Sequence, residues 1–278
     1  MLLTRRDFLL SLGAAGLSFS RRSSVGVPTL RLAIAESVDR GAEAARRGAM
    51  LGVDEARRAA ALFGLDVALV PLTSEAPPHA IVGTSTDAAT VSRLADDAAH
   101  RDAILLDAGC TDDDLRGARC ARHVLHVAAS EAMRRVALAL APGEGARVEL
   151  WHESLEPFGA AQLNDRFRAR WRAGMDGAAW AGWFAVKVAS EAFFRARRAE
   201  GDALLAAITA PAARFDGHKG RPLSFRAWDH QLRQPLYVVR GSTVSEVPAR
   251  AGATGTAAEQ LDRLGTRAAD SRCRWAAR

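Results

Sequence analysis

Three short segments of small or polar residues each follow an apolar run, and they are the best candidates for a binding site. They are Ala35-Glu36 after residues 30–35, Thr84-Ser85 after residues 80–83, and Ala108-Gly109 after residues 103–107. If the runs are parallel strands, the segments meet at one sheet edge, where doubly wound proteins bind their ligands. The sequence therefore predicts a site containing Glu36, Thr84, Ser85, Ala108 and Gly109. The alternative for Ser85 or Thr86 is a helix cap, which needs no ligand.

A second candidate is Trp151-His152-Glu153, which follows a predicted strand at residues 147–151. An indole, an imidazole and a carboxylate together could contact a polar organic ligand, so Trp151 and His152 are added to the predicted ligand-binding residues. The alternative is that the tryptophan covers the core while the histidine and glutamate face solvent.

Metal and catalytic chemistry are not predicted. His123 and His126 are three residues apart in a predicted strand, which places them on opposite faces. The acidic run Asp112-Asp113-Asp114 lacks the glycine and spaced glutamate of a calcium loop and is predicted to cap the turn at Leu115. No nucleophile elbow, zinc-protease motif, phosphate loop or dinucleotide fingerprint is present. We expect a protein that is not an enzyme and has no cofactor; an exported hydrolase is the weak alternative.

The N-terminus has the pattern of an export signal. Arg5-Arg6 precedes an apolar run of about 12 residues, which is short of the ~20 that span a bilayer as a helix. Ser18 and Ser20 provide a small-x-small cleavage pattern. Residues 1–27 are therefore predicted to be a twin-arginine signal peptide and linker, with cleavage after Ser20 or, alternatively, an uncleaved anchor. The mature protein is expected in the periplasm.

The basic composition does not predict a nucleic-acid partner. The net charge is +6, or +5 without Arg5, Arg6 and Asp7, but only two of the 38 basic residues are lysines. The arginines are spread among acidic residues, and no basic stripe interleaved with aromatic residues is present. The 49% hydrophobic content is enough for a packed core.

The elements that would position the first site alternate along residues 28–130. Strands are predicted at residues 30–35, 65–72, 80–83, 103–107 and 124–127, and helices at residues 41–63 and 86–99. Continuous apolar strands joined by helices are typical of a parallel sheet covered on both faces. The fold class is therefore α/β, with a doubly wound parallel sheet in an N-terminal lobe.

The pattern of predicted elements changes after residue 130. Residues 131–210 are predicted to be mainly helical, with helices at 131–140, 159–173 and 176–199. Aromatic residues recur at helical spacing there, which favours core packing. Residues 211–247 are predicted to form a hinge-crossing β-hairpin at Phe215–Phe225 followed by a strand at Gln234–Val239, and residues 248–278 a tail with one helix at 257–264.

The hairpin sequence Phe215-Asp-Gly-x-x-Gly220, followed by Pro235-Leu-Tyr-Val-Val239, closes this series of βαβ units. The layout resembles the type I periplasmic binding proteins, especially the branched-chain amino-acid-binding proteins of ABC importers. The resemblance implies that hydroxyl and N–H groups at Thr84-Ser85 and Ala108-Gly109 hold a ligand carboxylate and that Trp151-His152 faces the cleft. It also implies a small organic metabolite and the transporter's membrane subunits as partners.

A closer similarity is to the branch encoded beside PQQ-dependent alcohol dehydrogenase systems. It rests on residues 103–120, His123–His126, Trp151-His152, Gly159–Leu163 and Leu261–Gly265. Cys120 lies in the first of these segments and Cys273 follows the last, so the resemblance and an oxidising compartment predict a disulfide between them. Cys110, inside an apolar segment, is expected to be a buried free thiol.

The chain departs from this family between Leu140 and Trp151, where about ten residues replace several strand-helix units. The sequence therefore predicts a reduced, mainly helical second lobe and a cleft with one wall. The aromatic residues among 171–193 would then need cover from the first lobe, from a partner or from a second copy of the chain, and we expect compaction onto the first lobe or a dimer. Two functions follow: a solute-binding protein linked to alcohol oxidation, or an accessory or docking protein without a ligand cleft.

Overall fold

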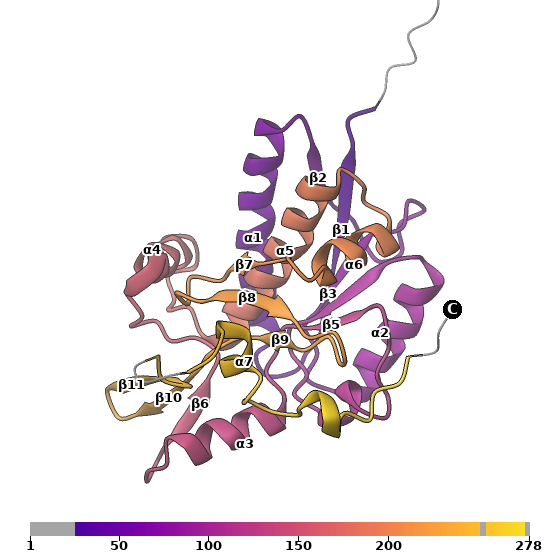
Figure 1. Ribbon diagram of the computed structural model, residues 1–278. Helices are drawn as coiled ribbons and strands as arrows, with labels where there is room; N and C mark the ends of the chain where they lie inside the picture. Colours follow the sequence, from indigo (N-terminus) through magenta and orange to yellow (C-terminus); the bar gives the residue numbers. More distant parts are fainter. Residues whose placement is uncertain (1–25, 251–253, 276–278) are drawn as a thin grey trace, which may run out of the picture.

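A five-stranded parallel sheet forms the centre of the computed structural model, which describes residues 26–250 and 254–275 (Figure 1). The strand order is β2-β1-β3-β4-β5. The strands are β1 (Thr29–Ala35), β2 (Asp66–Leu69), β3 (Ala80–Gly83), β4 (Ile104–Asp107) and β5 (Val124–His126). Every residue of β3, β4 and β5 is buried, which explains their continuous apolar sequences. The predicted doubly wound parallel sheet is confirmed.

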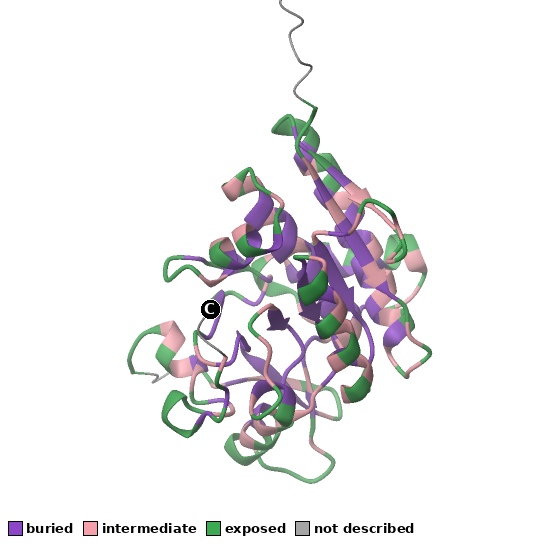
Figure 2. Ribbon diagram, turned by 90° about the vertical axis from the view of Figure 1, so that its right-hand side faces the viewer, coloured by how far each residue is buried: buried purple, intermediate pink, exposed green. Residues whose placement is uncertain are grey.

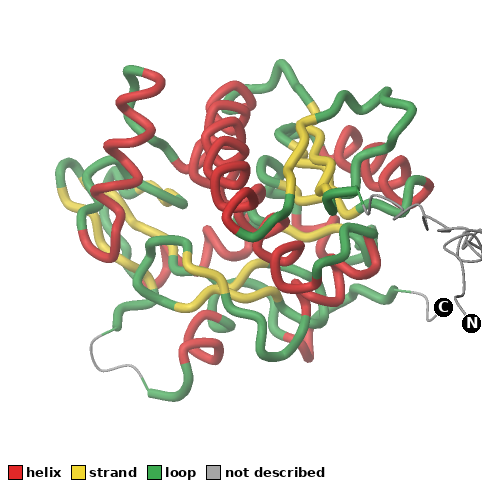
Figure 3. Tube along the Cα trace, turned by 90° about the horizontal axis from the view of Figure 1, so that it is seen from above, coloured by secondary structure: helices red, strands yellow, loops and turns green. Residues whose placement is uncertain are grey.

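Helices cover both faces of this sheet (Figure 3). Ile81 and Leu105 pack in one hydrophobic cluster with α2 (Ala88–His100). Their neighbours Val82 and Leu106 belong to the larger cluster on the other face. That face is covered by α1 (Ala42–Leu62), α5 (Gly177–Ala196) and α6 (Gly201–Thr209), the last of which the sequence analysis did not identify.

Helices α1 and α5 approach each other closely because glycines lie between them. A Cβ atom on Gly182 of α5 would overlap the carbonyl oxygen of Ala45, and one on Gly48 of α1 would overlap the carbonyl oxygen of Ala179. This packing buries Trp180, and the other aromatic residues of α5 that we expected to need cover, Trp183, Phe184 and Phe193, are also buried. Trp171, before α5 in the chain, is partly buried. Cover from within the chain, one of the two predicted alternatives, is therefore confirmed. Figure 2 shows the buried interior between the helices.

A second, three-stranded sheet has the antiparallel order β11-β10-β6. It joins β6 (Arg147–Glu149) to the much later strands β10 (Leu236–Arg240) and β11 (Thr243–Val247). A third small sheet contains β7 (Phe215–Asp216), β8 (Pro222–Phe225) and β9 (Leu232–Arg233). The hairpin predicted within Phe215–Phe225 is confirmed by the antiparallel pairing of β7 with β8, and the strand predicted after it is β10, which pairs with β6 and β11.

The remaining helices are α3 (Glu131–Leu140), α4 (Ala160–Trp171) and α7 (Ala257–Leu261). Residues 131–210 contain four helices of at least nine residues and the single strand β6, as predicted. The division of the chain into lobes at residue 130, and the reduction of the second lobe relative to a family, stay predictions. The proposed signal peptide lies outside the described residues, and none of the described helices has the length and apolar character that crossing a membrane requires.

A disulfide joins Cys120 to Cys273, with their Cα atoms 5.5 Å apart, in agreement with the predicted pair. Cys110 is a buried free thiol, also as predicted. The C-terminal segment is held further by the buried Arg226, whose guanidinium donates to the carbonyl oxygens of Leu264 and Thr266 and to Asp262. The tail thus returns to the central part of the molecule.

Candidate functional site

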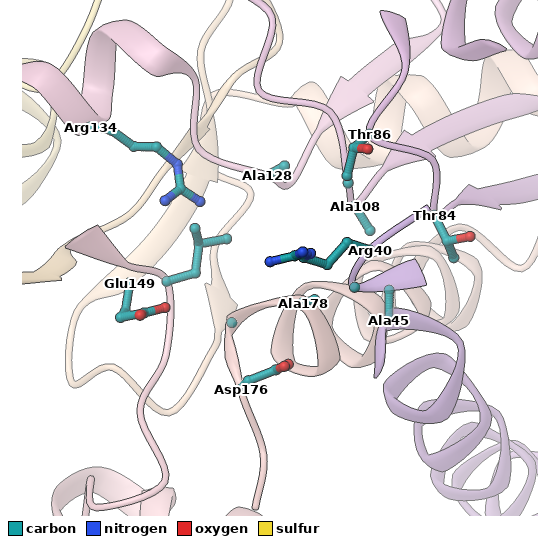
Figure 4. A pocket seen from close by; sticks show the side chains of 14 residues that line it. Arg40, Ala45, Thr84, Thr86, Ala108, Ala128, Arg134, Glu149, Asp176 and Ala178 are labelled. Atoms are coloured by element: carbon teal, nitrogen blue, oxygen red, sulfur yellow. The ribbon is translucent and has the colours of Figure 1, made fainter. Parts of the chain in front are cut away.

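A cavity of about 380 Å³ lies at the carboxyl ends of four strands of the central sheet (Figure 4). One side, here called the first wall, consists of the loops after β1, β3, β4 and β5 and the start of α1: Arg40, Gly41, Ala45, Thr84, Thr86, Ala108, Gly109 and Ala128. The opposite side, the second wall, comes from α3, β6 and the N-terminus of α5: Arg134, Glu149, Leu150, Asp176, Gly177 and Ala178.

The prediction of a cleft with one wall was therefore wrong. Between Leu140 and Trp151 the chain contributes only the short strand β6, which would not form a sheet alone. Residues 236–247 return as β10 and β11 and pair with it, so the second wall gains a sheet from late in the sequence.

The hydroxyl groups of Thr84 and of the adjacent Ser85 bond within the protein. Thr84 donates to the carbonyl oxygen of Ala35 at 2.8 Å. The Ser85 hydroxyl donates to Oδ2 of Asp39 at 2.5 Å, and the backbone N–H of Thr86 donates to the same oxygen at 2.9 Å. These bonds, that from Ser85 above all, lower the pKa of Asp39 to about 2. The Asp39 carboxylate thus occupies the position in which we expected a ligand carboxylate.

Neither Ser85 nor Thr86 is the N-cap of α2. That position belongs to Asp87, whose side chain accepts from the N–H groups of Ala89 and Thr90. The alternative reading of Ser85 or Thr86 as the cap was wrong, because the helix begins two residues later than predicted, at Ala88.

A buried polar network supports the first wall from below. Asp107, at the end of β4, accepts from the N–H groups of Gly109 and Cys110 at 3.2 and 2.9 Å and contacts Nδ1 of His126 at 2.9 Å. Burial opposes its ionisation, but the His126 hydrogen bond and the charge of Arg116, 3.6 Å away, hold the pKa of Asp107 below its usual value.

Arg116 connects this network to the loop after β5. Its guanidinium donates to the carbonyl oxygens of Cys110 and Ala128, both at 2.9 Å, and to Oε1 of Gln231 at 2.5 Å. The strand-end loops that carry Gly109 and Ala128 are therefore held in place by charge-assisted hydrogen bonds.

The residues considered for metal binding have structural roles. Asp112 caps the 3₁₀ helix Asp113–Arg116, as predicted. His126 bonds to Asp107, whereas Nε2 of His123 contacts the carbonyl oxygen of Ala95 on α2, so the two imidazoles have separate environments. Within residues 26–250 and 254–275, no group of histidine, cysteine or acidic side chains is placed to hold a metal ion.

On the second wall, the guanidinium group of Arg134 makes one hydrogen bond and no ion pair with the described residues. Nη1 of Arg134 donates to the carbonyl oxygen of Val148 at 3.0 Å, while its buried Nε has no hydrogen-bond partner. Burial lowers the pKa of Arg134. The two carboxylates of this wall are already engaged: Glu149 accepts from Arg147, and Asp176 caps α5 by accepting from the N–H of Ala179.

Arg40 faces this group from the first wall. Its side chain extends across the cavity toward the side that holds Arg134 (Figure 4). Arg40 is exposed and makes no hydrogen bond or ion pair with any residue that the structure describes. Two guanidinium groups without carboxylate partners thus line a space whose remaining surface is largely alanine and glycine. Such an arrangement can bind an anion without covalent chemistry.

The structure brings together Thr84, Ala108 and Gly109 of the predicted site, with Ser85 directly beside them. Glu36 lines a different depression, beside Arg46 and Leu69. Trp151 is buried, donates from Nε1 to Oδ1 of Asn164 at 2.7 Å and stacks on Trp180. Trp151 and His152 line a neighbouring pocket and not the cavity, and His152 bonds to Ser154.

Sequence reasoning missed Arg40, Arg134, Glu149 and Asp176. Nothing in their local sequence marks them, because Arg40 and Arg134 are two among 36 arginines of similar surroundings. A rule that would have included Arg40 is to extend each predicted strand end by five residues into the following loop.

Neither a protein-family model nor a curated protein matches the sequence. Solved structures do match the fold. A periplasmic binding protein from Burkholderia mallei has a TM-score of 0.69 at 10% identity, covering 88% of this chain and 98% of its own. The substrate-binding protein of a branched-chain amino acid transporter from Streptococcus pneumoniae, in complex with isoleucine, has a TM-score of 0.65 at 12% identity, covering 79% and 99%.

A solute-binding protein of an ABC transporter from Rhodopseudomonas palustris, in complex with benzoate, has a TM-score of 0.65 at 13% identity and covers 90% of this chain and 100% of its own. At such low identity these likenesses show the fold alone. The chain has the fold of type I periplasmic binding proteins, and the neighbours named here are solute-binding proteins of transporters or of the periplasm.

Proposed function

We propose that this protein is the periplasmic solute-binding component of an ABC importer and that it holds a small organic acid in the cavity between its two walls. The observation that carries the proposal is the pair of guanidinium groups, Arg40 and Arg134, at a cavity of about 380 Å³. A volume of this size suits a small metabolite, and the alanine-rich lining suits an apolar body attached to the acid group.

The finer parts of the proposal rest on sequence resemblance. Export follows from Arg5-Arg6, and the association with PQQ-dependent alcohol oxidation follows from the segments around Cys120 and Cys273. The fold neighbours that carry isoleucine or benzoate make a carboxylate ligand a reasonable first choice. The membrane subunits of the importer would be the partners, and the ligand would leave unchanged.

A thermal-shift screen tests this function. The purified protein is heated with C2–C8 carboxylic acids, the corresponding alcohols, amino acids and PQQ. A ligand at 100 times its Kd adds about 2.7 kcal/mol to the free energy of unfolding. Saturable stabilisation by acids but not by the matched alcohols is expected. If no compound stabilises the protein and a dehydrogenase co-purifies with it, the accessory-protein alternative replaces the proposal.

A further inference from the structure

The cavity offers two places for an acid group, and one of them is already filled by the protein itself. The corner formed by the Ser85 hydroxyl and the Thr86 N–H holds the Asp39 carboxylate at 2.5 and 2.9 Å. The Ser37 hydroxyl lies beside this residue and accepts from the backbone N–H of Asp39 at 3.3 Å. A ligand carboxylate would have to displace Asp39 before it could reach these donors.

The second place is the space between Arg40 and Arg134. Both guanidinium groups lack a carboxylate partner among the described residues, and Nε of Arg134 is buried with its N–H unused. Nη2 of Arg134 is not among the buried atoms and donates to no residue that the structure describes, so an oxyanion in the cavity can accept from it without displacing another bond. Arg40 extends from the opposite wall and can reach the same oxyanion (Figure 4).

We propose that Asp39 is a specificity residue that closes the strand-end corner, so that the ligand's acid group binds between Arg40 and Arg134 instead. This inference rests on the proposed function and names the chemical class of its ligand: a monocarboxylate with an apolar body. The body would contact Ala45, Ala108 and Ala128 of the first wall. An α-amino acid whose carboxylate needs the strand-end donors is excluded by the Asp39 side chain and its negative charge.

Calorimetric titration of the purified protein with benzoate and with L-isoleucine tests the inference. Benzoate is expected to bind the unaltered protein, and Arg134→Gln and Arg40→Gln are each expected to weaken that binding at least tenfold. Arg135→Gln is the matched control, because Arg135 follows Arg134 on α3 but is 66% exposed and pairs with Asp113 outside the cavity. Its affinity for benzoate is expected within twofold of the unaltered protein.

Asp39→Ala opens the Ser85–Thr86 corner and is expected to bind L-isoleucine at least tenfold more tightly than the unaltered protein does. Arg134→Gln could fail to fold, whereas Arg40 is exposed and Arg40→Gln is expected to fold normally. Thermal melts of each variant show whether it is folded, and Arg40→Gln tests the inference in either case.

The outcomes separate the two claims. If the unaltered protein binds benzoate and both arginine variants bind it equally well, this inference is overturned while the proposed function stands. The inference is also overturned if L-isoleucine binds the unaltered protein as tightly as Asp39→Ala. If the unaltered protein binds no carboxylate in either this titration or the thermal-shift screen, the proposed function itself fails, and the inference fails with it.

Discussion

The two walls of the cavity differ in how completely their polar groups are satisfied. On the first wall, Thr84, Ser85 and Thr86 bond to Ala35 and Asp39, and Asp107 and Arg116 hold the loops beneath. On the second wall, Arg134 keeps one buried N–H without a partner. Arg40 is an exception on the first wall, since it has no hydrogen bond or ion pair with the described residues, and it extends toward the second wall (Figure 4).

The difference shows which wall can bond to a ligand without first losing hydrogen bonds within the protein. A ligand that competed for the first wall would break hydrogen bonds that the folded protein already makes. A ligand at Arg134 can accept from Nη2, which donates to no described residue, so no hydrogen bond within the protein has to break. The wall with fewer internal bonds is therefore the better place for the ligand's acid group.

The largest loss of stability is expected for a substitution at the contact of α1 with α5, where the two walls are joined. Ala45 of α1 lines the first wall, and the N-terminus of α5 lines the second. Gly182→Ala places a Cβ atom onto the carbonyl oxygen of Ala45, and backbone must move to relieve the overlap. A loss of about 3 kcal/mol or more in the free energy of unfolding is expected, measured by urea denaturation.

Ala61→Val is the matched control for Gly182→Ala. Ala61 lies at the exposed end of α1, where two added carbons meet no neighbour in the core. A change within about 0.5 kcal/mol is expected for the control. Equal stability of Gly182→Ala and the unaltered protein would show that the walls are not joined through this contact.

The next largest loss of stability is expected in the buried network of Asp107, His126 and Arg116 beneath the first wall. Asp107→Asn removes the carboxylate that faces the buried Arg116 and leaves that charge uncompensated, which typically costs about 3 kcal/mol. The exposed Asp165→Asn on α4, which loses only a surface pair with Arg168, is expected to cost under about 0.5 kcal/mol. Similar costs for the two variants in denaturation would contradict the network's role.

A smaller effect of acid is expected from His230, whose backbone carbonyl accepts from the N–H of His126 beside that network. Burial is the main cause that lowers its pKa from 6.5 to about 4. Because the unfolded chain binds the proton more readily, stability is full above about pH 6.5 and is lower by about 2 kcal/mol at pH 5.

Chemical denaturation between pH 7 and pH 5 measures this dependence. His230→Phe is expected to reduce it, since the variant lacks one of the buried imidazoles that gain a proton, while His79 and His126 keep their share. His100→Gln, at an exposed site on α2, is the control and is expected to keep it. An unchanged slope in His230→Phe would assign the acid sensitivity elsewhere, with the partly buried His79, whose pKa is also lowered to about 4, as the next candidate.

The smallest effect on stability is expected on the second wall. Glu149 pairs with the exposed Arg147, so Glu149→Gln is expected to change the free energy of unfolding by under about 0.5 kcal/mol. The same change removes a negative charge near Arg134 and is expected to tighten benzoate binding about twofold to fivefold, measured by calorimetry. Weaker binding in this variant would mean that Glu149 itself contacts the ligand.

The sequence predicts the first wall better than the second because the first wall is local. Each strand from β1 to β5 is a continuous apolar run, and each site segment follows its strand directly, so the position of Thr84 and Gly109 needs only the rule for doubly wound sheets. The same local rule does not reveal that Asp39, 46 residues before Ser85, fills the corner.

The second wall depends on pairings across long sequence separations. Tyr237 pairs with Glu149, and this pairing supplies a sheet that the short segment after Leu140 cannot form alone. The expectation of a single wall came from the few residues between Leu140 and Trp151, because the sequence does not show that a late strand pairs with this segment. Arg134 was missed for a related reason: its role depends on an unsatisfied N–H, which only the packed structure displays.

The most direct test of the central claim is a crystal structure of the protein grown with 4-bromobenzoate, in which the anomalous signal of bromine locates the ligand. The account predicts the carboxylate between the guanidinium groups of Arg40 and Arg134, with Asp39 still bonded to Ser85 and Thr86. A ligand bound outside the cavity, or a carboxylate on Ser85 with Asp39 displaced, would contradict it.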